Sequence, residues 1–480
     1  MSGVEGAFTP ERRLLTIGLI GLVTAAAFEG MAVPTILPAM VEDLGGLDLY
    51  GWTFSAFWLT NIIGITLAGS DADRRGPGRA FAVGVILFAA GMLVSGIANE
   101  MSVVIAGRAI QGFGSGAIGS VVYAAIARAY PASVTPRMIA LVSSAWVVPG
   151  LIGPALAGWV TDTFDWRWVI LGMVPPVLVM GLAVYPQLAR LAAAQRTAVP
   201  MRGDTRRAFD ALRLAIGSTL LLAALTIGPV LGIDRWLVAL ALALAGGWLA
   251  IGAVRHLLPP GTLSLRRGRP AVVAVVFIIA FAFFGTEAFV PLTVVDVRGG
   301  SVTMGGLALS AAAITWTTGS WVQARAAAVG VRRTLVTSGA GLIGAGIMIT
   351  ALVLVPQMPI VTAAVGWAVA GLGMGLAYSM LALMVLETAA PGEEGFSSSA
   401  LQLMFTLGTA LGVGVGGAVV AVADAGAISL PSAIGIIHAV MVVVAAVAVA
   451  VSLRVPHGPS NDPDRSRLST GAATVPMEHL

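Results

Sequence analysis

Three charged side chains stand inside long apolar stretches of the sequence: Glu29, Arg108 and Glu287. A charge in hydrocarbon is costly, and such residues typically mark proton relays or the paths of ions and substrates. A carboxylate that moves relative to a guanidinium, or relative to water, changes its affinity for a proton. These residue types therefore predict that Glu29 and Arg108 form a proton-coupling pair in which Glu29 takes up and releases the proton, with Glu287 as a second carboxylate that shares the proton or attracts a cation. The alternative is a static ion pair that only fixes helix packing.

The spacing predicts that Glu29 and Arg108 lie at a similar depth in the membrane. Glu29 stands about 9 residues before Pro38 and Arg108 about 7 residues after the start of its apolar stretch, which at about 1.5 Å per helical residue is the same half of a bilayer. Neutral polar residues in these stretches are the candidates for orienting a ligand. They are Asn61, Gln111, Gln323 and Gln402.

The elements that carry these residues follow from the composition. Of 480 residues, 58% are hydrophobic and 10% are charged, and the mean hydropathy is +0.94. A soluble domain carries about 25% charged residues, so soluble enzymes, nucleic-acid-binding domains and disordered proteins are excluded. A helix needs about 20 apolar residues to cross a hydrocarbon core of about 30 Å. The pattern predicts an all-α polytopic membrane protein with fourteen transmembrane helices, expected at 14–40, 51–70, 80–98, 101–127, 139–161, 168–188, 214–233, 236–254, 271–295, 303–327, 334–355, 359–387, 396–422 and 432–453.

The arginines predict an orientation for these helices. All 27 basic residues are Arg, and an inside N-terminus places 23 of them on the inner side. Inner loops of membrane proteins are rich in Arg and Lys, so both termini are expected in the cytoplasm. The stretch 189–213 is then a cytoplasmic loop, and the polar tail 454–480 is expected to be a disordered cytoplasmic segment.

Two parts of the chain resemble each other. The segment 107–114 reads GRAIQGFG and the segment 366–373 reads GWAVAGLG, 259 residues later. A glutamate followed by a proline also recurs, as Glu29 with Pro34 and Glu287 with Pro291. This offset corresponds to eight spans, so spans one to six match spans nine to fourteen, and spans seven and eight are an insertion. Parallel halves with a site between them near the midplane are a recurring plan among transporters.

Three short motifs occur in order along the first half. They are GSDADRRG over 69–76, RAIQG over 108–112 and GPALAG over 153–158. They are similar to G-x-x-x-D-R-x-G, R-x-x-Q-G and G-P-x-x-G-G. On these motifs the chain resembles the major facilitator superfamily, and within it the 14-helix drug:proton antiporter branch, over residues 10–455.

The resemblance implies a 6 + 2 + 6 arrangement with parallel halves. It places an N-terminal six-helix bundle at 14–188, two inserted helices at 214–254 and a C-terminal six-helix bundle at 271–453. It implies a transporter that exports hydrophobic or cationic compounds by alternating access, with the proton gradient as energy source and no cofactor. The expected partners are a small amphipathic or lipid-like substrate, protons and the lipids of a bacterial plasma membrane. We expect a monomer that binds no nucleic acid.

Two of the motifs carry expected roles. The loop motif is expected to be a latch that holds the inner gate closed, because glycine allows a sharp chain reversal; the alternative is a solvated turn. Its residues are Gly69, Asp73, Arg74 and Gly76. The span-five motif is expected to give a bent, tightly packed helix rather than a substrate contact, because proline removes a backbone hydrogen bond and glycine permits close approach. Its residues are Gly153, Pro154 and Gly158.

Other functions are disfavoured by what the sequence lacks. It has no Cys, and its four His show no metal-ligand spacing, so no metal site is expected. It contains no GxxxxGK[ST] motif and no nucleophile with a base, so neither ATP hydrolysis nor an embedded enzyme is expected. A scaffold that moves nothing fits poorly with charges in hydrocarbon. The alternative that stays open is a transporter of the same fold that exports a lipid or an endogenous metabolite.

Overall fold

The computed structural model describes residues 8–9, 12–131, 133–195, 205–230, 233–326, 331–387 and 394–456. Throughout these residues the regular secondary structure is helical. Eleven helices in this part of the chain are long and apolar enough to cross a membrane. The chain is therefore a multi-pass membrane protein, as its composition predicts.

The first half of the chain is a bundle of helices joined by short connections. Their bounds are α1 Arg13–Leu44, η1 Leu47–Leu49, α2 Tyr50–Arg75, α3 Pro77–Gly96, α4 Met101–Ala129, α5 Thr135–Ser144, α6 Val147–Thr163, α7 Trp166–Leu171 and α8 Val174–Gln195. Two ranges expected as single helices, 139–161 and 168–188, are each interrupted. The interruptions precede Pro149 and the Pro175–Pro176 pair, because proline has no N–H to give to the preceding turn.

Two further helices and a second bundle follow. The pair consists of α9 Thr205–Val230 and α10 Ile233–Leu257. The second bundle contains α11 Arg269–Glu287, α12 Val290–Leu292, the π-helical turn η2 Thr293–Val297, α13 Val302–Ala326, α14 Arg332–Ala351, η4 Leu352–Leu354, α15 Val361–Glu387, α16 Glu394–Asp424 and α17 Leu430–Ser452. Helix covers both ends of the expected loop 189–213, since α8 and α9 extend into it. The rest of that loop, 196–204, and the tail from 457 lie outside the described residues.

Three of the fourteen expected spans are helical but are not among the eleven apolar ones. They are 51–70 in α2, 139–161 in α5 and α6, and 303–327 in α13. Helices α2 and α13 carry many Gly, Ser and Thr residues, and α5 and α6 are individually shorter than a span. All three segments lie in the bundles, where α2 packs against α4 and α16 and α6 packs against α13. The lower hydropathy of α2 and α13 is consistent with helices that face other helices rather than lipid.

The same close glycine contacts occur in both halves at the offset of the sequence repeat. A Cβ atom added at Gly107 of α4 would lie 2.8 Å from the carbonyl oxygen of Gly91 in α3. A Cβ atom added at Gly366 of α15 would lie 2.8 Å from the carbonyl oxygen of Gly346 in α14. These positions differ by 259 and 255 residues. Small residues let helices approach closely in a membrane, and here they do so at matching positions of each bundle.

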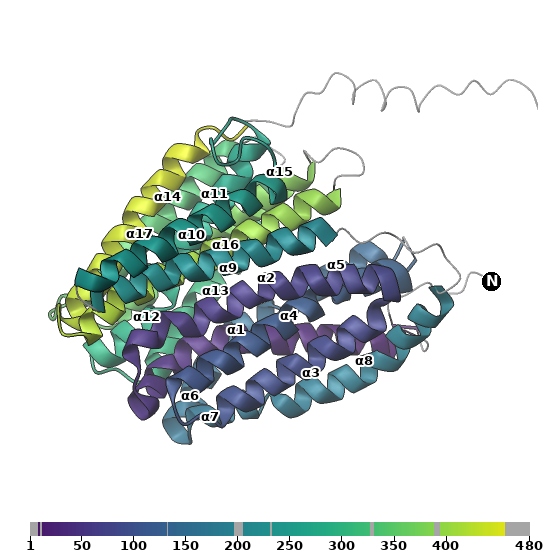
Figure 1. Ribbon diagram of the computed structural model, residues 1–480, viewed down its shortest axis with the longest axis horizontal. Helices are drawn as coiled ribbons and strands as arrows, with labels where there is room; N and C mark the ends of the chain where they lie inside the picture. The colour runs from purple at the N-terminus through teal and green to yellow at the C-terminus, as the bar shows by residue number, and fades with distance from the viewer. Residues whose placement is uncertain are drawn as a thin grey trace, which may run out of the picture.

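The two bundles meet at one end of the molecule, which we call the closed end. Figure 1 shows them nearest to each other around α12 and farther apart toward the end marked N. At the closed end, backbone meets backbone: a Cβ atom on Gly51 of α2 would lie 2.6 Å from the Cα atom of Gly417 in α16. Ser55 donates a hydrogen bond to the carbonyl oxygen of Ala410, also across the two halves (2.9 Å). We call this line of contact between α2 and α16 the glycine seam.

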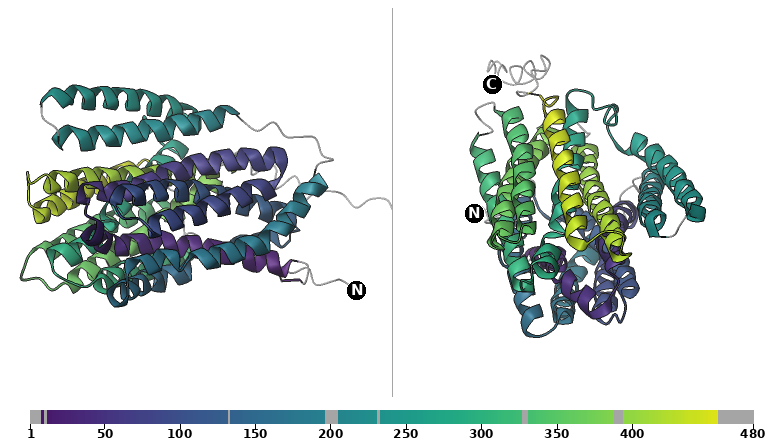
Figure 2. Two further views of the ribbon diagram at one scale, coloured as in Figure 1. Left: turned by 60° about the horizontal axis from the view of Figure 1, so that its bottom comes forward. Right: turned by 90° about the vertical axis from the view of Figure 1, so that its left-hand side faces the viewer.

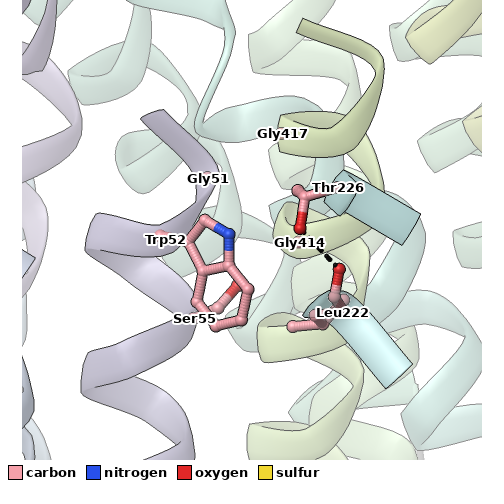
Figure 3. Close-up of a pocket in the computed structure, with 7 residues that line it drawn as sticks. All are labelled: Gly51, Trp52, Ser55, Leu222, Thr226, Gly414 and Gly417. Atoms are coloured by element: carbon pink, nitrogen blue, oxygen red, sulfur yellow. Dashed lines mark hydrogen bonds between the residues drawn. The ribbon is translucent and has the colours of Figure 1, made fainter. Parts of the chain in front are cut away.

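Helix α9 lies over the glycine seam. It packs against both α2 and α16, while α10 packs on α9, farther from the bundles (Figure 2). Its Leu222 side chain is buried against Leu59 and Ala410, and a Cβ atom on Gly414 would meet it. A narrow apolar pocket lies between the three helices (Figure 3). It is lined by Gly51, Trp52, Ser55, Leu222, Thr226, Gly414 and Gly417.

Candidate functional site: two buried glutamates

Glu29 of α1 and Arg108 of α4 form an ion pair in the interior of the first bundle. Their side chains are each 3% exposed. The Arg108 Nη1 atom also donates to Gln111 Oε1 (2.8 Å), and Nε donates to the carbonyl oxygen of Thr53 in α2 (3.2 Å). The guanidinium lies over the Phe57 ring, 4.2 Å from its centroid, so one face of the cation is covered by an aromatic ring. Glu29 and Arg108, which the sequence predicts to lie at a similar depth, are thus in direct contact.

One carboxylate oxygen of Glu29 accepts no hydrogen bond. Among the described residues, Glu29 Oε2 and Gln111 Nε2 are buried and have no hydrogen-bond partner. A buried carboxylate oxygen without a donor is costly, and a proton or a water molecule relieves the cost. The arrangement can therefore bind a proton on Glu29.

Glu287, the last residue of α11, has a different partner in the second bundle. Trp367 of α15 is fully buried and donates its indole N–H to Glu287 Oε2 (3.4 Å). Trp367 stacks on Phe283, with ring centroids 4.7 Å apart. Aromatic rings continue from there: Phe283 meets Trp316 (5.5 Å), and Phe284 meets Phe405 (5.3 Å). Glu287 is only partly buried, so a carboxylate stands at the edge of an aromatic cluster.

The chain breaks its helix directly after Glu287. Helix α11 ends there, α12 begins at Val290, and Pro291 cannot donate to the preceding turn. The carbonyl oxygen of Ala288 in this break accepts a hydrogen bond from the Tyr50 hydroxyl, which belongs to the other half (2.9 Å). The Tyr50 ring also stacks on Phe289 (5.4 Å, 27°), so Tyr50 contacts two successive residues of the break.

The span-five motif faces the second bundle at the closed end. A Cβ atom on Gly158 of α6 would lie 2.6 Å from the Cα atom of Thr303 in α13, and one on Gly306 would meet the Pro154 carbonyl. Gly153 instead faces Phe28 of α1 (3.3 Å). Close packing of this helix, as expected from the sequence, is therefore observed.

Asp162 closes the same contact with its carboxylate. Its Oδ1 atom accepts from the Val302 amide (3.1 Å), and Oδ2 accepts from the amide (2.9 Å) and hydroxyl of Thr303. Asp162 therefore caps the first turn of α13 from the opposite half. A carboxylate at a helix N-terminus is favoured by the exposed amides and by the helix dipole.

The neutral polar candidates have different surroundings. Gln111 belongs to the Glu29–Arg108 site. Asn61 donates to the Gly112 carbonyl (3.4 Å) and ties α2 to α4, and Gln323 approaches the Met380 sulfur (3.9 Å) and ties α13 to α15. Gln402 is exposed and lies near Thr406 of its own helix (3.5 Å).

The turn formed by the loop motif is shorter than expected. Helix α2 continues to Arg75 and α3 begins at Pro77, so Gly76 alone makes the reversal, with φ +86°. Gly69 lies within α2 with no heavy atom within 4 Å of a Cβ placed there, and Arg74 is exposed. The side chain of Asp73 lies outside the described residues. Arg128 of α4 donates to the Ala72 carbonyl beside this turn (3.2 Å).

Comparison with known proteins decides the family. The family model described as Major Facilitator Superfamily matches residues 18–363. The chain belongs to the major facilitator superfamily. It is accordingly a transporter rather than an enzyme. Within the described residues, no group of three or more His, Cys, Asp or Glu could hold a metal ion.

Relatives of this major facilitator are known among bacteria. It is 26% identical over 416 residues to the multidrug transporter protein MdtP of Bacillus subtilis, which covers 85% of this chain and 75% of that one. It is 26% identical over 430 residues to a probable multidrug-efflux transporter of Mycobacterium tuberculosis, covering 86% and 89%. The fold is similar to that of the xylose transporter XylE from E. coli, with a TM-score of 0.59 at 15% identity, over 91% of this chain and 96% of that one.

Three residues of this major facilitator site were missed in the sequence: Tyr50, Asp162 and Trp367. Trp367 could have been found, because it follows Arg108 by the 259-residue offset of the repeat. Tyr50 and Asp162 bind backbone groups of the opposite half. Every residue has such backbone groups, so the sequence does not indicate which of them a side chain will bind.

Proposed function

We propose that this protein is a proton-coupled multidrug exporter that moves hydrophobic or cationic compounds by alternating access. The buried Glu29–Arg108 pair carries the proposal, because a carboxylate with one free oxygen beside a guanidinium suits reversible protonation. The names of its relatives in Bacillus subtilis and Mycobacterium tuberculosis support multidrug efflux.

The proposal includes a place and an orientation in the cell. We propose fourteen spans in a bacterial plasma membrane, and the distribution of the arginines supports both termini in the cytoplasm. In this orientation the closed end faces outward, and the structure is inward-facing. The 14-helix drug:proton antiporter branch of the superfamily is the one whose known plan fits these features.

The proton gradient supplies enough energy for such export. One inward proton yields about 2.3 kcal/mol per 100 mV and about 1.4 kcal/mol per pH unit. The sum of about 3.7 kcal/mol supports a substrate gradient of several hundred-fold, at about 1.4 kcal/mol per decade. No other energy source or cofactor is required.

Glu287 and the aromatic cluster are the proposed substrate-recognition region. A lipophilic cation gains from the faces of aromatic rings and from a nearby carboxylate. Trp316, Phe405 and Tyr378 continue the cluster from Phe284, and they provide flat apolar surface for a bulky compound. A neutral hydrophobic substrate would use the rings without the carboxylate.

Transport into inverted membrane vesicles tests the function directly. Uptake of tetraphenylphosphonium and of neutral drugs is measured with and without a pH gradient, next to fluorescent lipid analogues. We expect gradient-dependent drug uptake that is lost in Glu29→Gln. Uptake of lipids alone would support the alternative, an exporter of a lipid or an endogenous metabolite, and uptake that ignores the gradient would contradict proton coupling.

A further inference from the structure

The first turn of α2 touches both glutamate sites. On one side, the carbonyl oxygen of Thr53 accepts from Arg108 Nε (3.2 Å), and Arg108 holds Glu29. On the other side, the Tyr50 hydroxyl donates to the carbonyl of Ala288, the residue directly after Glu287 (2.9 Å). All the hydrogen bonds of this chain of contacts are buried.

The turn itself is held together by a fourth buried hydrogen bond. Thr53 Oγ1 donates to the carbonyl oxygen of Tyr50 (2.7 Å). Thr53 and Tyr50 are both 0% exposed, and the Tyr50 ring is stacked on Phe289 beside the helix break. Buried hydrogen bonds in a low-dielectric environment are strong and expensive to leave unmade. A displacement of Arg108 is therefore passed to Tyr50 rather than absorbed by water.

This connection exists only while the closed end is closed. Tyr50 belongs to the first half and Ala288 to the second, and their bond lies next to the Gly51–Gly417 contact. When the bundles part at this end, Tyr50 must leave Ala288, and the helix break after Glu287 loses its donor. Two carboxylates lie near this bond. Asp296 of η2 interacts electrostatically with the Tyr50 hydroxyl, and Glu42 of α1 interacts with Asp296.

We propose that the Tyr50 hydroxyl is the positioning group that couples proton binding at Glu29 to ligand binding at Glu287. Tyr50 touches neither carboxylate, so it acts through Thr53 and Arg108 on one side and through the Ala288 carbonyl on the other. A proton on Glu29 weakens its pairing with Arg108, the guanidinium shifts, and the turn of α2 changes its hold on the end of α11. Because coupling between two binding events is reciprocal, a cation at Glu287 also changes the proton affinity of Glu29. The proposal rests on the proton-coupled export proposed above.

The test is an equilibrium measurement on the purified full chain in detergent. Tetraphenylphosphonium binding is titrated over a range of pH for the unmodified chain and for Glu29→Gln. Because Glu287 itself takes up protons at low pH, the coupling is the factor by which the ratio of the dissociation constants at the two ends of the range falls in Glu29→Gln. Typical couplings between sites are about 5- to 150-fold. For the unmodified chain we expect a coupling in this range, and for Tyr50→Phe the same ratio as for Glu29→Gln, with binding retained. The Phe ring keeps the stack on Phe289 and removes only the hydroxyl.

A matched control is available in the same bundle. Tyr130 is also buried, and its hydroxyl is hydrogen-bonded to Thr16 (2.8 Å), far from the α2 turn. Tyr130→Phe should keep the coupling ratio of the unmodified chain. Thr53→Val, which removes the hydrogen bond within the turn, should lower the ratio. Thr53→Ser keeps the hydroxyl and should keep the ratio of the unmodified chain. These variants give a second measurement should Tyr50→Phe not fold.

The outcomes separate this inference from the proposed function. A ratio that stays at the value of the unmodified chain in both Tyr50→Phe and Thr53→Val overturns the coupling role of Tyr50 and leaves proton-coupled export intact. A ratio that Glu29→Gln does not change overturns proton coupling at Glu29 itself, and the role of Tyr50 with it. Loss of coupling in Tyr130→Phe as well would mean that any lost buried hydroxyl has this effect, which also overturns the proposal.

Discussion

Arg108 and Trp367 occupy matching positions in the two bundles, 259 residues apart, and each donates a hydrogen bond to a glutamate of its own half. The matching positions carry opposite chemistry. Arg108 neutralises Glu29 with a full charge, whereas Trp367 offers Glu287 a neutral N–H at 3.4 Å. The duplicated framework thus presents one paired and one uncompensated carboxylate. This difference suits Glu29 to binding a proton and Glu287 to binding a cationic ligand.

Glu29→Gln should abolish drug-induced proton release from proteoliposomes while drug binding partly survives, because the amide keeps the shape but cannot titrate. Arg108→Ala leaves Glu29 buried without a cation, which costs about 3–5 kcal/mol and should also lower thermal stability. Arg167→Ala is the control: it removes a half-exposed pair with Asp43, worth about 0–1 kcal/mol. Unchanged proton release in Glu29→Gln would contradict the assignment.

Glu287→Gln should weaken export of cationic drugs about tenfold or more and leave neutral drugs nearly unchanged, since a charge-assisted contact contributes about 1.5–3 kcal/mol. Export of ethidium and of an uncharged drug is compared in the same vesicles at equal protein abundance. Trp367→Phe keeps the stack on Phe283 but loses the N–H, so it should affect both classes less. An equal loss for both drugs in Glu287→Gln, together with a loss of protein, would make Glu287 a folding residue.

Asp162→Ala should shift the protein toward opening at the closed end. A lost helix cap costs about 1 kcal/mol, which is about fivefold in the equilibrium between the two conformations. The sequence has no Cys, so spin labels on Phe164→Cys and Val361→Cys, both exposed at the closed end, report the distance without interfering thiols. Asp165→Ala is the matched control, because Asp165 caps α7 within its own half (2.7 Å). A longer distance in both variants would argue against a role specific to Asp162.

Gly51→Ala should prevent full closure, because the new Cβ atom would lie 2.6 Å from the Cα atom of Gly417, and backbone cannot move aside as a side chain can. The same pair of spin labels should show a longer distance, and transport should fall. Gly119→Ala in α4 meets no heavy atom within 4 Å and should behave like the unmodified chain. A closed end that tolerates Gly51→Ala would show that the two backbones are not in contact in the membrane.

The parts of the site that could be predicted are those in which side chain meets side chain. Glu29 and Arg108 were predictable as partners because opposite charges at one depth of an apolar bundle have few other ways to be stabilised. The ends of helices were less predictable: Gly76 alone forms a turn expected to span several residues, because α2 stays helical through Arg75. The Tyr50 and Asp162 contacts depend on how the two bundles approach each other, which no local pattern encodes.

Because of α9, the two lines of contact between the bundles are covered differently on the side that faces the lipid. The bundles meet along α2 and α16 on one side and along α6 and α13 on the other, and α9 adds a third helix to the first of these. Leu222 fills the notch at Gly414, so α9 must slide or tilt whenever α2 and α16 part. A hydrophobic molecule dissolved in the bilayer thus meets a doubled wall at the glycine seam. Lateral access from the membrane is consequently expected on the side of α6 and α13, away from their contact at the closed end, because the inserted pair does not add a second layer there.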